Sequence, residues 1–227
     1  ASRLADYFHQ YCPKTYVAKG LFGQSTNTGD LTGEVVETSD KKVNIDEIDE
    51  ALQSFLGTYS QVPHSFSATK HNGKPLYEYS REGIFIEKEP VDRFIHSLKL
   101  DSLDGLIFKF TSTVSSGTYI RTLFEDIAKK IGSCGHLLEL ERTSIGEKIK
   151  LSDSLEEKYW PIRGDNFDMD IGKCPSELLN FSRFDLSLDN CTLYFNGGRI
   201  KVSGLNNQFY GVFSPDGKVV GLGEVIE

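Results

Sequence analysis

The sequence feature that most constrains the fold is a glycine-containing turn, residues 116–122, between a segment with strand periodicity and one with helix periodicity. Before the turn, the pattern is that of a strand with one buried face: Leu106, Phe108, Phe110, Ser112 and Val114. After it, apolar residues recur at helical spacing and end at a glycine: Ile120, Leu123, Ile127, Ile131 and Gly132. We therefore predict a strand, a sharp turn at Gly117, and a helix that carries Tyr119 and Arg121 in its first turn.

Arg121 is unusual at this position, because the start of a helix carries a positive partial charge and favours acidic residues. An arginine placed against that preference usually has a carboxylate or phosphate partner. The alternative is a solvated arginine beside a core tyrosine, Tyr119. Spacing alone leaves both interpretations open.

Strand and helix patterns also alternate elsewhere in the first 150 residues. Asn44-Ile-Asp-Glu47 has the form of a helix-capping box, and helical spacing follows it up to Gly57. Asp104-Gly105 predicts a hairpin turn. Further strands, the last of them alternatively a buried edge, are predicted at Tyr16–Gly23, Glu34–Glu37, Phe94–Leu100 and Leu137–Arg142.

Residues 59–74 lack clear periodicity and are rich in polar and basic side chains. Long structured loops in compact domains are often functional. A short helix is predicted directly after this segment, at residues 76–81. The segment and its flank contain one of two basic groups, which comprise Lys70, His71, Lys74 and Arg81, and then Arg121, Lys129, Lys130 and Arg142. A solvated face is the alternative interpretation of both groups.

The C-terminal part has a different pattern. Residues 151–175 show acidic residues, proline and glycine and read as a connecting region. From Phe181 onward we predict a small all-β unit, with short strands at Thr192–Phe195, Arg199–Val202, Phe209–Phe213 and Val219–Val225. The predicted domain boundary therefore lies between residues 175 and 176.

Composition excludes several classes of protein. The net charge of −8 counts against indiscriminate binding to nucleic acid, although it allows a local basic groove. No apolar run approaches the length of a membrane span. The four cysteines are scattered without metal-ligand spacing, which predicts reduced thiols in a cytoplasmic protein: Cys12, Cys134, Cys174 and Cys191.

Several ordered motifs resemble the TruB family of RNA pseudouridine synthases. The central ones are Gly117-Thr-Tyr-Ile-Arg-Thr122 and Cys134-Gly-His-Leu-Leu-Glu-Leu-Glu-Arg-Thr143. Upstream, the similar motifs are Lys14-Thr15-Tyr16, Gly23-Gln24 with Thr26, Thr28 and Asp30, and Val62-Pro63 with Ser67-Ala68, Lys70, Gly73-Lys74 and Leu76-Tyr77-Glu78-Tyr79. Near the C-terminus they are Asn196-Gly197-Gly198 and Gly221-Leu-Gly223-Glu224, which resemble the family's PUA-type RNA-binding domain.

The resemblance implies an α+β fold: a mainly antiparallel mixed sheet with flanking helices, followed by a small PUA-like barrel. Residues 1–175 would form the catalytic domain, with an RNA-binding insertion at 59–83, and residues 176–227 the barrel. The implied activity is isomerisation of uridine to pseudouridine in the T loop of tRNA, by base flipping, glycosidic cleavage and reattachment at C5. It implies no metal ion or organic cofactor, no membrane contact, the T arm of tRNA as partner, and a monomer as the simplest state.

Site residues are carried over position by position. Tyr16 matches the tyrosine that stacks on the extruded base and that is a candidate proton acceptor at C5. Arg121 matches the arginine that pairs with the catalytic aspartate. Leu140 matches an apolar wall of the base pocket, and Tyr119 either supports that pocket or simply packs. RNA contacts are expected from Lys70, His71, Lys74, Tyr77, Arg81 and Arg142.

One departure from the family pattern is large. The family's catalytic aspartate lies in a Leu-Asp-x-x-Ala-Thr-Gly motif that does not occur in these 227 residues. We therefore expect that N-terminal residues are missing, that Arg121 lacks its carboxylate partner, and that the chain alone forms no pseudouridine. Substitute acids would be Asp30, Asp126 and Glu125. Two rivals remain: a catalytically inactive homologue that binds or folds tRNA, and a protein without RNA function that uses a small β module for partner contacts.

Overall fold

The structure is a computed structural model that describes residues 2–63, 70–71, 73–75, 79, 88–154, 178, 181–206 and 208–226. The chain divides into two compact units, one of residues 7–152 and one of residues 1–6 with 153–227. The boundary predicted between residues 175 and 176 lies outside the described residues.

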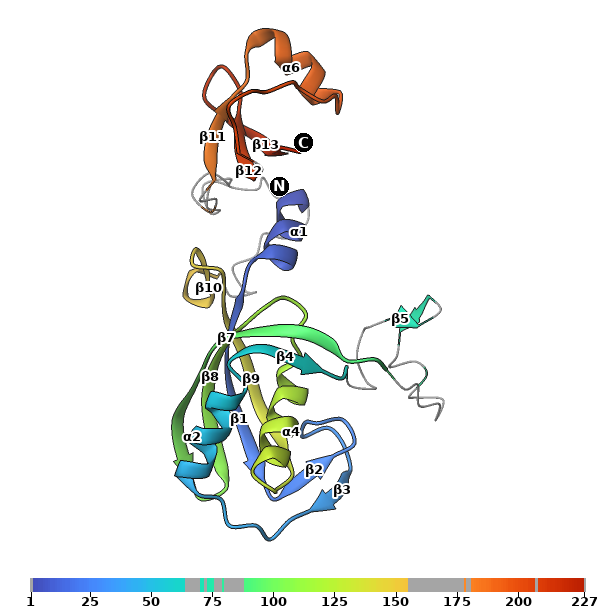
Figure 1. The fold of residues 1–227 in the computed structure, drawn as a ribbon, viewed down its shortest axis with the longest axis vertical. Helices are drawn as coiled ribbons and strands as arrows, with labels where there is room; N and C mark the ends of the chain where they lie inside the picture. The colour runs from blue at the N-terminus through green and yellow to red at the C-terminus, as the bar shows by residue number, and fades with distance from the viewer. Residues whose placement is uncertain are drawn as a thin grey trace, which may run out of the picture. The chain divides into compact units, whose positions relative to one another are not determined.

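The larger unit is built on a six-stranded antiparallel sheet (Figure 1), in the order β10-β9-β1-β8-β7-β4. Its strands are β1 (Lys14–Phe22), β4 (Gly57–Gln61), β7 (Val91–Asp104), β8 (Ile107–Val114), β9 (Gly135–Ile145) and β10 (Ile149–Lys150). The hairpin predicted at Asp104-Gly105 joins β7 to β8, and Gly105 has a φ of +59°. The prediction of an α+β fold around a mainly antiparallel sheet is confirmed.

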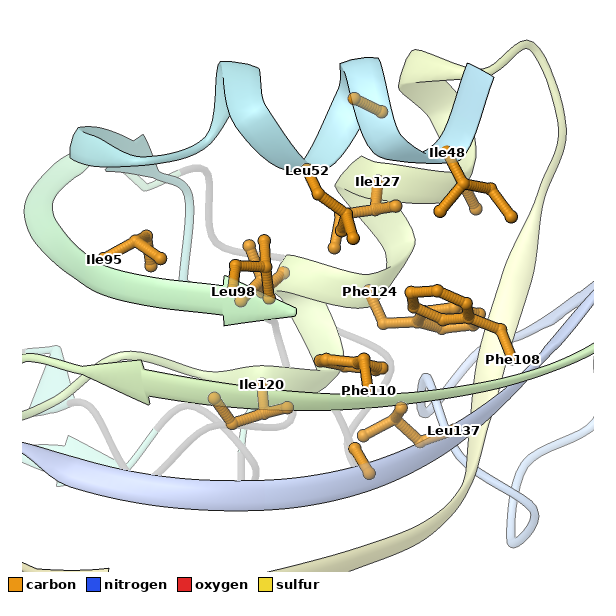
Figure 2. Packing of buried hydrophobic residues seen from close by; sticks show 14 of the residues in the cluster. Ile48, Leu52, Ile95, Leu98, Phe108, Phe110, Ile120, Phe124, Ile127 and Leu137 are labelled. Carbon is orange, nitrogen blue, oxygen red and sulfur yellow. The ribbon is translucent and has the colours of Figure 1, made fainter. Parts of the chain in front are cut away.

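Two helices pack on one face of this sheet and form the core with it. Helix α2 (Ile45–Ser54) begins at Asn44, whose side chain accepts a hydrogen bond from the Asp46 amide at 3.0 Å. Helix α4 (Ile120–Lys130) follows the turn at Gly117, where φ is +79°. Figure 2 shows side chains of both helices and of β7, β8 and β9 meeting in one cluster, which includes Ile48, Leu52, Leu98, Phe108, Phe110, Phe124, Ile127 and Leu137.

The ring of Phe124 brings α4 unusually close to the sheet. A Cβ atom on Gly20 of β1 would lie 2.2 Å from this ring, and one on Gly135 of β9 would lie 2.8 Å from it. Any larger residue at these positions would push the helix away. The ring also packs against Phe22 and Phe108, with centroids 5.1 and 5.9 Å away. The depth of α4 on the sheet is therefore fixed by two glycines and one phenylalanine.

Two small hairpins extend from this unit. Strands β2 (Gln24–Thr26) and β3 (Val35–Thr38) pair and enclose the loop of residues 27–34. Strands β5 (Lys70–His71) and β6 (Lys74–Pro75) pair across Gly73, which has a φ of +82°. The short helix predicted at residues 76–81 falls almost wholly outside the described residues.

The side chain of the buried Lys14 caps the C-terminal end of the N-terminal helix α1 (Ser2–Tyr11). Its ammonium group donates to the carbonyl oxygens of Phe8 at 3.2 Å, His9 at 2.5 Å and Cys12 at 2.8 Å. A cation at the end of a helix satisfies carbonyls that have no partner inside the helix and favours the negative end of the helix dipole. The Ser116 hydroxyl also donates to the His9 carbonyl. The end of α1 is therefore tied both to β1 and to the turn before α4.

The described part of the C-terminal unit contains a three-stranded sheet in the order β11-β12-β13 and one helix. The strands are β11 (Ser182–Asp185), β12 (Phe209–Phe213) and β13 (Val219–Glu224), and β11 pairs with β12 in parallel. The helix is α6 (Leu188–Phe195). A 3-10 turn, η1 (Leu151–Asp153), spans the point in the sequence where the larger unit ends.

The prediction of an all-β C-terminal unit is wrong, because α6 covers the strand expected at Thr192–Phe195. The Ser187 hydroxyl accepts a hydrogen bond from the Asn190 amide at 3.3 Å and caps a helix that ends before Gly197, whose φ is +75°. This local cap outweighs the strand preference of the residues that follow it. The strand expected at Arg199–Val202 is also wrong, since these described residues lie in no helix or strand.

None of the helices that the structure describes is long and apolar enough to cross a membrane.

We predict that Lys14→Met lowers the free energy of unfolding of the larger unit by about 2 kcal/mol, because buried carbonyl acceptors lose their donor. Amide hydrogen exchange in β1 and β8 measures this free energy for the larger unit by itself. The matched control is Lys19→Met on the same strand. Lys19 is 39% exposed in its ion pair with Glu139, so its loss should cost less than about 1 kcal/mol. Equal effects of the two substitutions would contradict the capping role of Lys14.

Candidate active site at the start of helix α4

Arg121 forms an ion pair with Asp30 in the loop between β2 and β3. Its Nη1 atom donates to Asp30 Oδ2 at 2.7 Å and to the carbonyl oxygen of Thr28 at 3.2 Å. The expectation that Arg121 has no carboxylate partner within this chain is therefore wrong. Between the two interpretations left open by the sequence, the structure favours the paired arginine over the solvated one.

The Asp30 carboxylate is held firmly by its own loop. Its Oδ1 atom accepts from the Thr28 hydroxyl at 2.9 Å, the Thr32 hydroxyl at 2.6 Å and the Thr32 amide at 3.0 Å. Burial acts to raise the pKa of Asp30, but the hydrogen bonds from Thr32 and Thr28 and the charge of Arg121 hold it below its ordinary value. Asp30 is therefore an ionised anchor whose oxygens are already occupied, which makes it a poor proton acceptor.

The anchor is fixed in turn to the sheet. The Leu137 amide of β9 donates to the Gly29 carbonyl oxygen at 3.0 Å, and Asp30 forms a β-bridge with Leu137. The Thr26 hydroxyl donates to the Asp30 carbonyl oxygen at 2.7 Å. Arg121 is thus held by a loop that is bonded to β9 of the sheet, and only its Nη1 atom is engaged within the described residues. Its Nε and Nη2 donors remain available for a second anion.

The other two candidate acids lie next to each other on α4 in different surroundings. Asp126 accepts a hydrogen bond from the hydroxyl of the buried Tyr59 and lies 3.8 Å from the Lys129 ammonium. Glu125 lies under the Asp30 loop, where a Cβ atom on Gly29 would come within 2.8 Å of its carboxylate. Burial raises the pKa of Glu125 to about 7 against the charges of Lys129 and Arg121.

Tyr16, Leu140 and Arg142 lie on the sheet face that α4 covers. In the pairing of β1 with β9, Tyr16 is opposite Arg142 and Ala18 is opposite Leu140. Directly opposite residues share a face of an antiparallel sheet, and Ala18 belongs to the core. Leu140 is nevertheless 47% exposed, and Tyr16 packs only partly against the core. An apolar side chain and a tyrosine therefore line an open stretch of this face, three residues beyond the bridge to Asp30.

The remaining predicted contacts are placed only in part. Tyr119 is the N-cap residue of α4 and is partly exposed. Lys70, His71 and Lys74 lie on the β5–β6 hairpin, which places them within one tight turn of backbone. Tyr77 and Arg81 lie outside the described residues. Within the part of the chain that the structure describes, no group of three or more His, Cys, Asp or Glu side chains could hold a metal ion.

Sequence reasoning missed Asp30 as the partner of Arg121. It weighed Asp30 only as a substitute catalytic acid. The available signal was the run of threonines around Asp30, at positions 26, 28 and 32, because hydroxyl-rich loops of this kind organise a carboxylate through local hydrogen bonds.

Comparison with known proteins points to one family. A sequence model described as TruB family pseudouridylate synthase (N terminal domain) matches residues 1–120. A relative named tRNA pseudouridine synthase B from Neisseria gonorrhoeae (strain NCCP11945) is 41% identical over 157 residues, which are 69% of this chain and 51% of the relative. Its namesake from Methylobacillus flagellatus is 33% identical over 213 residues, 93% of this chain and 70% of that protein. The chain thus spans about half the length of the Neisseria relative.

A solved structure shares the fold at low sequence identity. The crystal structure of the archaeal box H/ACA sRNP Nop10-Cbf5 complex contains a chain that superimposes with a TM-score of 0.62 at 16% identity. The match covers 97% of this chain and 61% of that chain. It supports the fold alone.

We predict that Glu125→Gln stabilises the larger unit above about pH 7, on the order of 1 kcal/mol. A carboxyl with a raised pKa in the folded state leaves stability intact below its unfolded pKa, and stability is lost as the pH rises toward the folded pKa of about 7. Amide hydrogen exchange or urea unfolding at pH values from about 4 to 8 would show this loss in the wild type but not in the variant. Glu50→Gln, at an exposed position of α2, is the matched control. Parallel pH profiles of wild type and Glu125→Gln would show that Glu125 titrates normally.

Proposed function

The chain belongs to the TruB family of pseudouridylate synthases, and we propose that it isomerises uridine to pseudouridine in the T loop of tRNA. In this reaction the N1–C1′ bond breaks and a C5–C1′ bond forms. The hydrogen on C5 leaves as a proton, and N1 gains one. The protein must therefore expose the base, hold it beside a reacting group and accept the C5 proton.

The observation that carries the proposal is the Asp30–Arg121 pair at the start of α4. Asp30 holds Nη1 of the guanidinium from the sheet side, so the arginine is oriented before substrate arrives. We propose that its remaining donors grip the reacting aspartate that the family motif implies. Bidentate contact with a guanidinium keeps a carboxylate ionised and fixes its direction.

The roles of the other residues follow from the face that they share. Tyr16 stacks on the extruded uracil and accepts the C5 proton. Leu140 forms an apolar wall beside it, and its 47% exposure supports this role because a core leucine would be covered. Tyr119 borders the same pocket from the start of α4. Asp30, with its occupied oxygens and lowered pKa, orients Arg121 instead of attacking the sugar.

The rest of the chain is proposed to hold the tRNA. The first residues of the predicted insertion, 59–61, belong instead to strand β4 of the sheet. The rest of 59–83 is proposed to form an insertion in the catalytic domain, 1–175, that contacts the T arm through Lys70, His71, Lys74, Tyr77 and Arg81. Arg142 is proposed to add a contact on β9. Residues 176–227 form a PUA-like RNA-binding domain. The three-stranded sheet in that segment supports this assignment. The protein is proposed to act as a cytoplasmic monomer without a metal ion or cofactor.

We predict that the full-length protein releases tritium from tRNA labelled at C5 of its uridines. Arg121→Lys should reduce this turnover by roughly 100-fold or more, because an ammonium point charge cannot hold two carboxylates in a fixed geometry. Binding of tRNA should stay close to that of the wild type. Tight tRNA binding without tritium release would instead identify a tRNA-binding homologue without catalysis.

A separate prediction concerns the basic hairpin. Replacing both Lys70 and Lys74 by Ala should weaken tRNA binding and reduce the slope of log affinity against log salt by roughly 1 to 2, because fewer counterions are released. Filter binding at several salt concentrations measures both quantities. Replacement of Lys148 and Lys150, two exposed lysines outside the predicted contact set, is the matched control. An unchanged slope in the Lys70 and Lys74 variant would show that these lysines belong to a solvated face and do not contact tRNA.

A further inference from the structure

Helix α4 begins without a capping side chain of its own. Its N-cap residue is Tyr119, which makes no side-chain capping hydrogen bond, although helix starts favour Ser, Thr, Asp or Asn at this position. The position matters because Arg121 lies two residues further along the chain. Something else has to fix the start of this helix.

The side chain of Gln61 binds both backbone groups of Tyr119. The Tyr119 amide donates to Gln61 Oε1 at 2.8 Å, and Gln61 Nε2 donates to the Tyr119 carbonyl oxygen at 3.0 Å. The same carbonyl accepts the first hydrogen bond of the helix, from the Leu123 amide at 3.0 Å. Gln61 therefore clamps the residue at which the helix begins, from a strand 58 positions away in the chain.

The Gln61 side chain is buried, and both of its polar atoms are bonded within the protein. It is 1% exposed and is among the largest fully buried side chains of the described chain. Its Nε2 atom also lies 3.4 Å from the hydroxyl of Tyr59, which donates to Asp126 further along α4. Tyr59 and Gln61 are two residues apart and both point inward from β4. A buried amide with both ends bonded resists rotation, because turning it would leave two buried backbone groups without partners.

We propose that Gln61 is a positioning residue for the reaction: by clamping the Tyr119 backbone it sets where Arg121 presents its free donors. This inference rests on the proposed function for its catalytic consequence. Two independent supports then hold the arginine, since Gln61 fixes the backbone at the helix start and Asp30 fixes the tip of the guanidinium. An orientation error of about 1 Å at a catalytic group can cost roughly 100-fold in rate.

The first test compares Gln61→Leu with a variant that is destabilised elsewhere. In the full-length protein, Gln61→Leu should lower the single-turnover rate of tritium release by roughly 10- to 100-fold, because Arg121 would be misplaced. Its affinity for tRNA should stay within about threefold. Leu52→Ala, in the core on α2, is the control for stability and should lose rate only in proportion to its unfolded fraction. A rate loss in Gln61→Leu no larger than in this control would overturn the inference.

The second test uses Gln61→Glu and pH. An ionised glutamate keeps an acceptor for the Tyr119 amide but places a second oxygen against the Tyr119 carbonyl and beside the Tyr59–Asp126 pair. A protonated glutamate can donate to that carbonyl again. Burial raises the pKa of a carboxyl at such a position, so the rate relative to wild type should recover as the pH falls from about 8 to about 6. No recovery, or the same recovery in Gln61→Leu, would overturn the inference.

Two further measurements locate the effect. If Gln61 acts through Arg121, then Gln61→Leu should cost less than about threefold in an Arg121→Lys background. Hydrogen exchange at the Tyr119 amide should accelerate at least roughly tenfold in Gln61→Leu while amides of α2 keep their rates. Full additivity or unchanged exchange would overturn the inference. Absence of pseudouridine from the wild-type reaction would overturn only the proposed function. Hydrogen exchange at the Tyr119 amide tests the contact with Gln61 independently of activity.

Discussion

The structure depends on how closely Phe124 lets helix α4 approach the sheet. Its ring lies where side chains at Gly20 and Gly135 would otherwise stand, and it joins the aromatic cluster of Phe22, Phe108 and Phe110. Close packing of this kind leaves the helix no freedom to slide. Arg121 lies one turn before Phe124 and Glu125 directly after it. Packing of the core therefore determines how far Arg121 and Glu125 lie from the sheet.

Polar contacts then refine what packing has placed. Three supports from outside the helix act on α4: Gln61 at the Tyr119 backbone, Tyr59 at Asp126, and Asp30 at Arg121. They come from an edge strand and from a loop bridged to β9, so the helix is held from two sides of the same unit. Two acids beside this helix differ in pKa: hydrogen bonds from Thr32 and Thr28 and the charge of Arg121 lower the pKa of Asp30, whereas burial raises the pKa of Glu125. Environment, not residue type, assigns one carboxyl the role of a permanent anion.

Local signals in the sequence predicted the strand, turn and helix around Gly117, because periodicity and glycine positions act over a few residues. They also predicted α2 and the β7–β8 hairpin. The partner of Arg121 could not be predicted in this way, since Asp30 is 91 positions away and its approach depends on the bridge to Leu137. The strand expected at Thr192–Phe195 was wrong for a local reason. Residues 192–195 favour strands, but the cap at Ser187 starts a helix that includes them. The roles of Tyr16 and Leu140 in binding a base stay predictions.

Pairing with Asp30 also bears on how an acidic chain can bind RNA. The charge of Arg121 is neutralised by a carboxylate at 2.7 Å, so this arginine releases few counterions and adds little to affinity for phosphate. Arg121 instead contributes orientation, because its guanidinium presents hydrogen-bond donors in a fixed planar geometry. Under the proposed function, affinity for RNA is expected from other cations, and Lys70 and Lys74 lie close together in the backbone of the β5–β6 hairpin. The proposed function thus assigns orientation of the reacting groups and retention of the tRNA to separate parts of the chain, and a net charge of −8 is compatible with both.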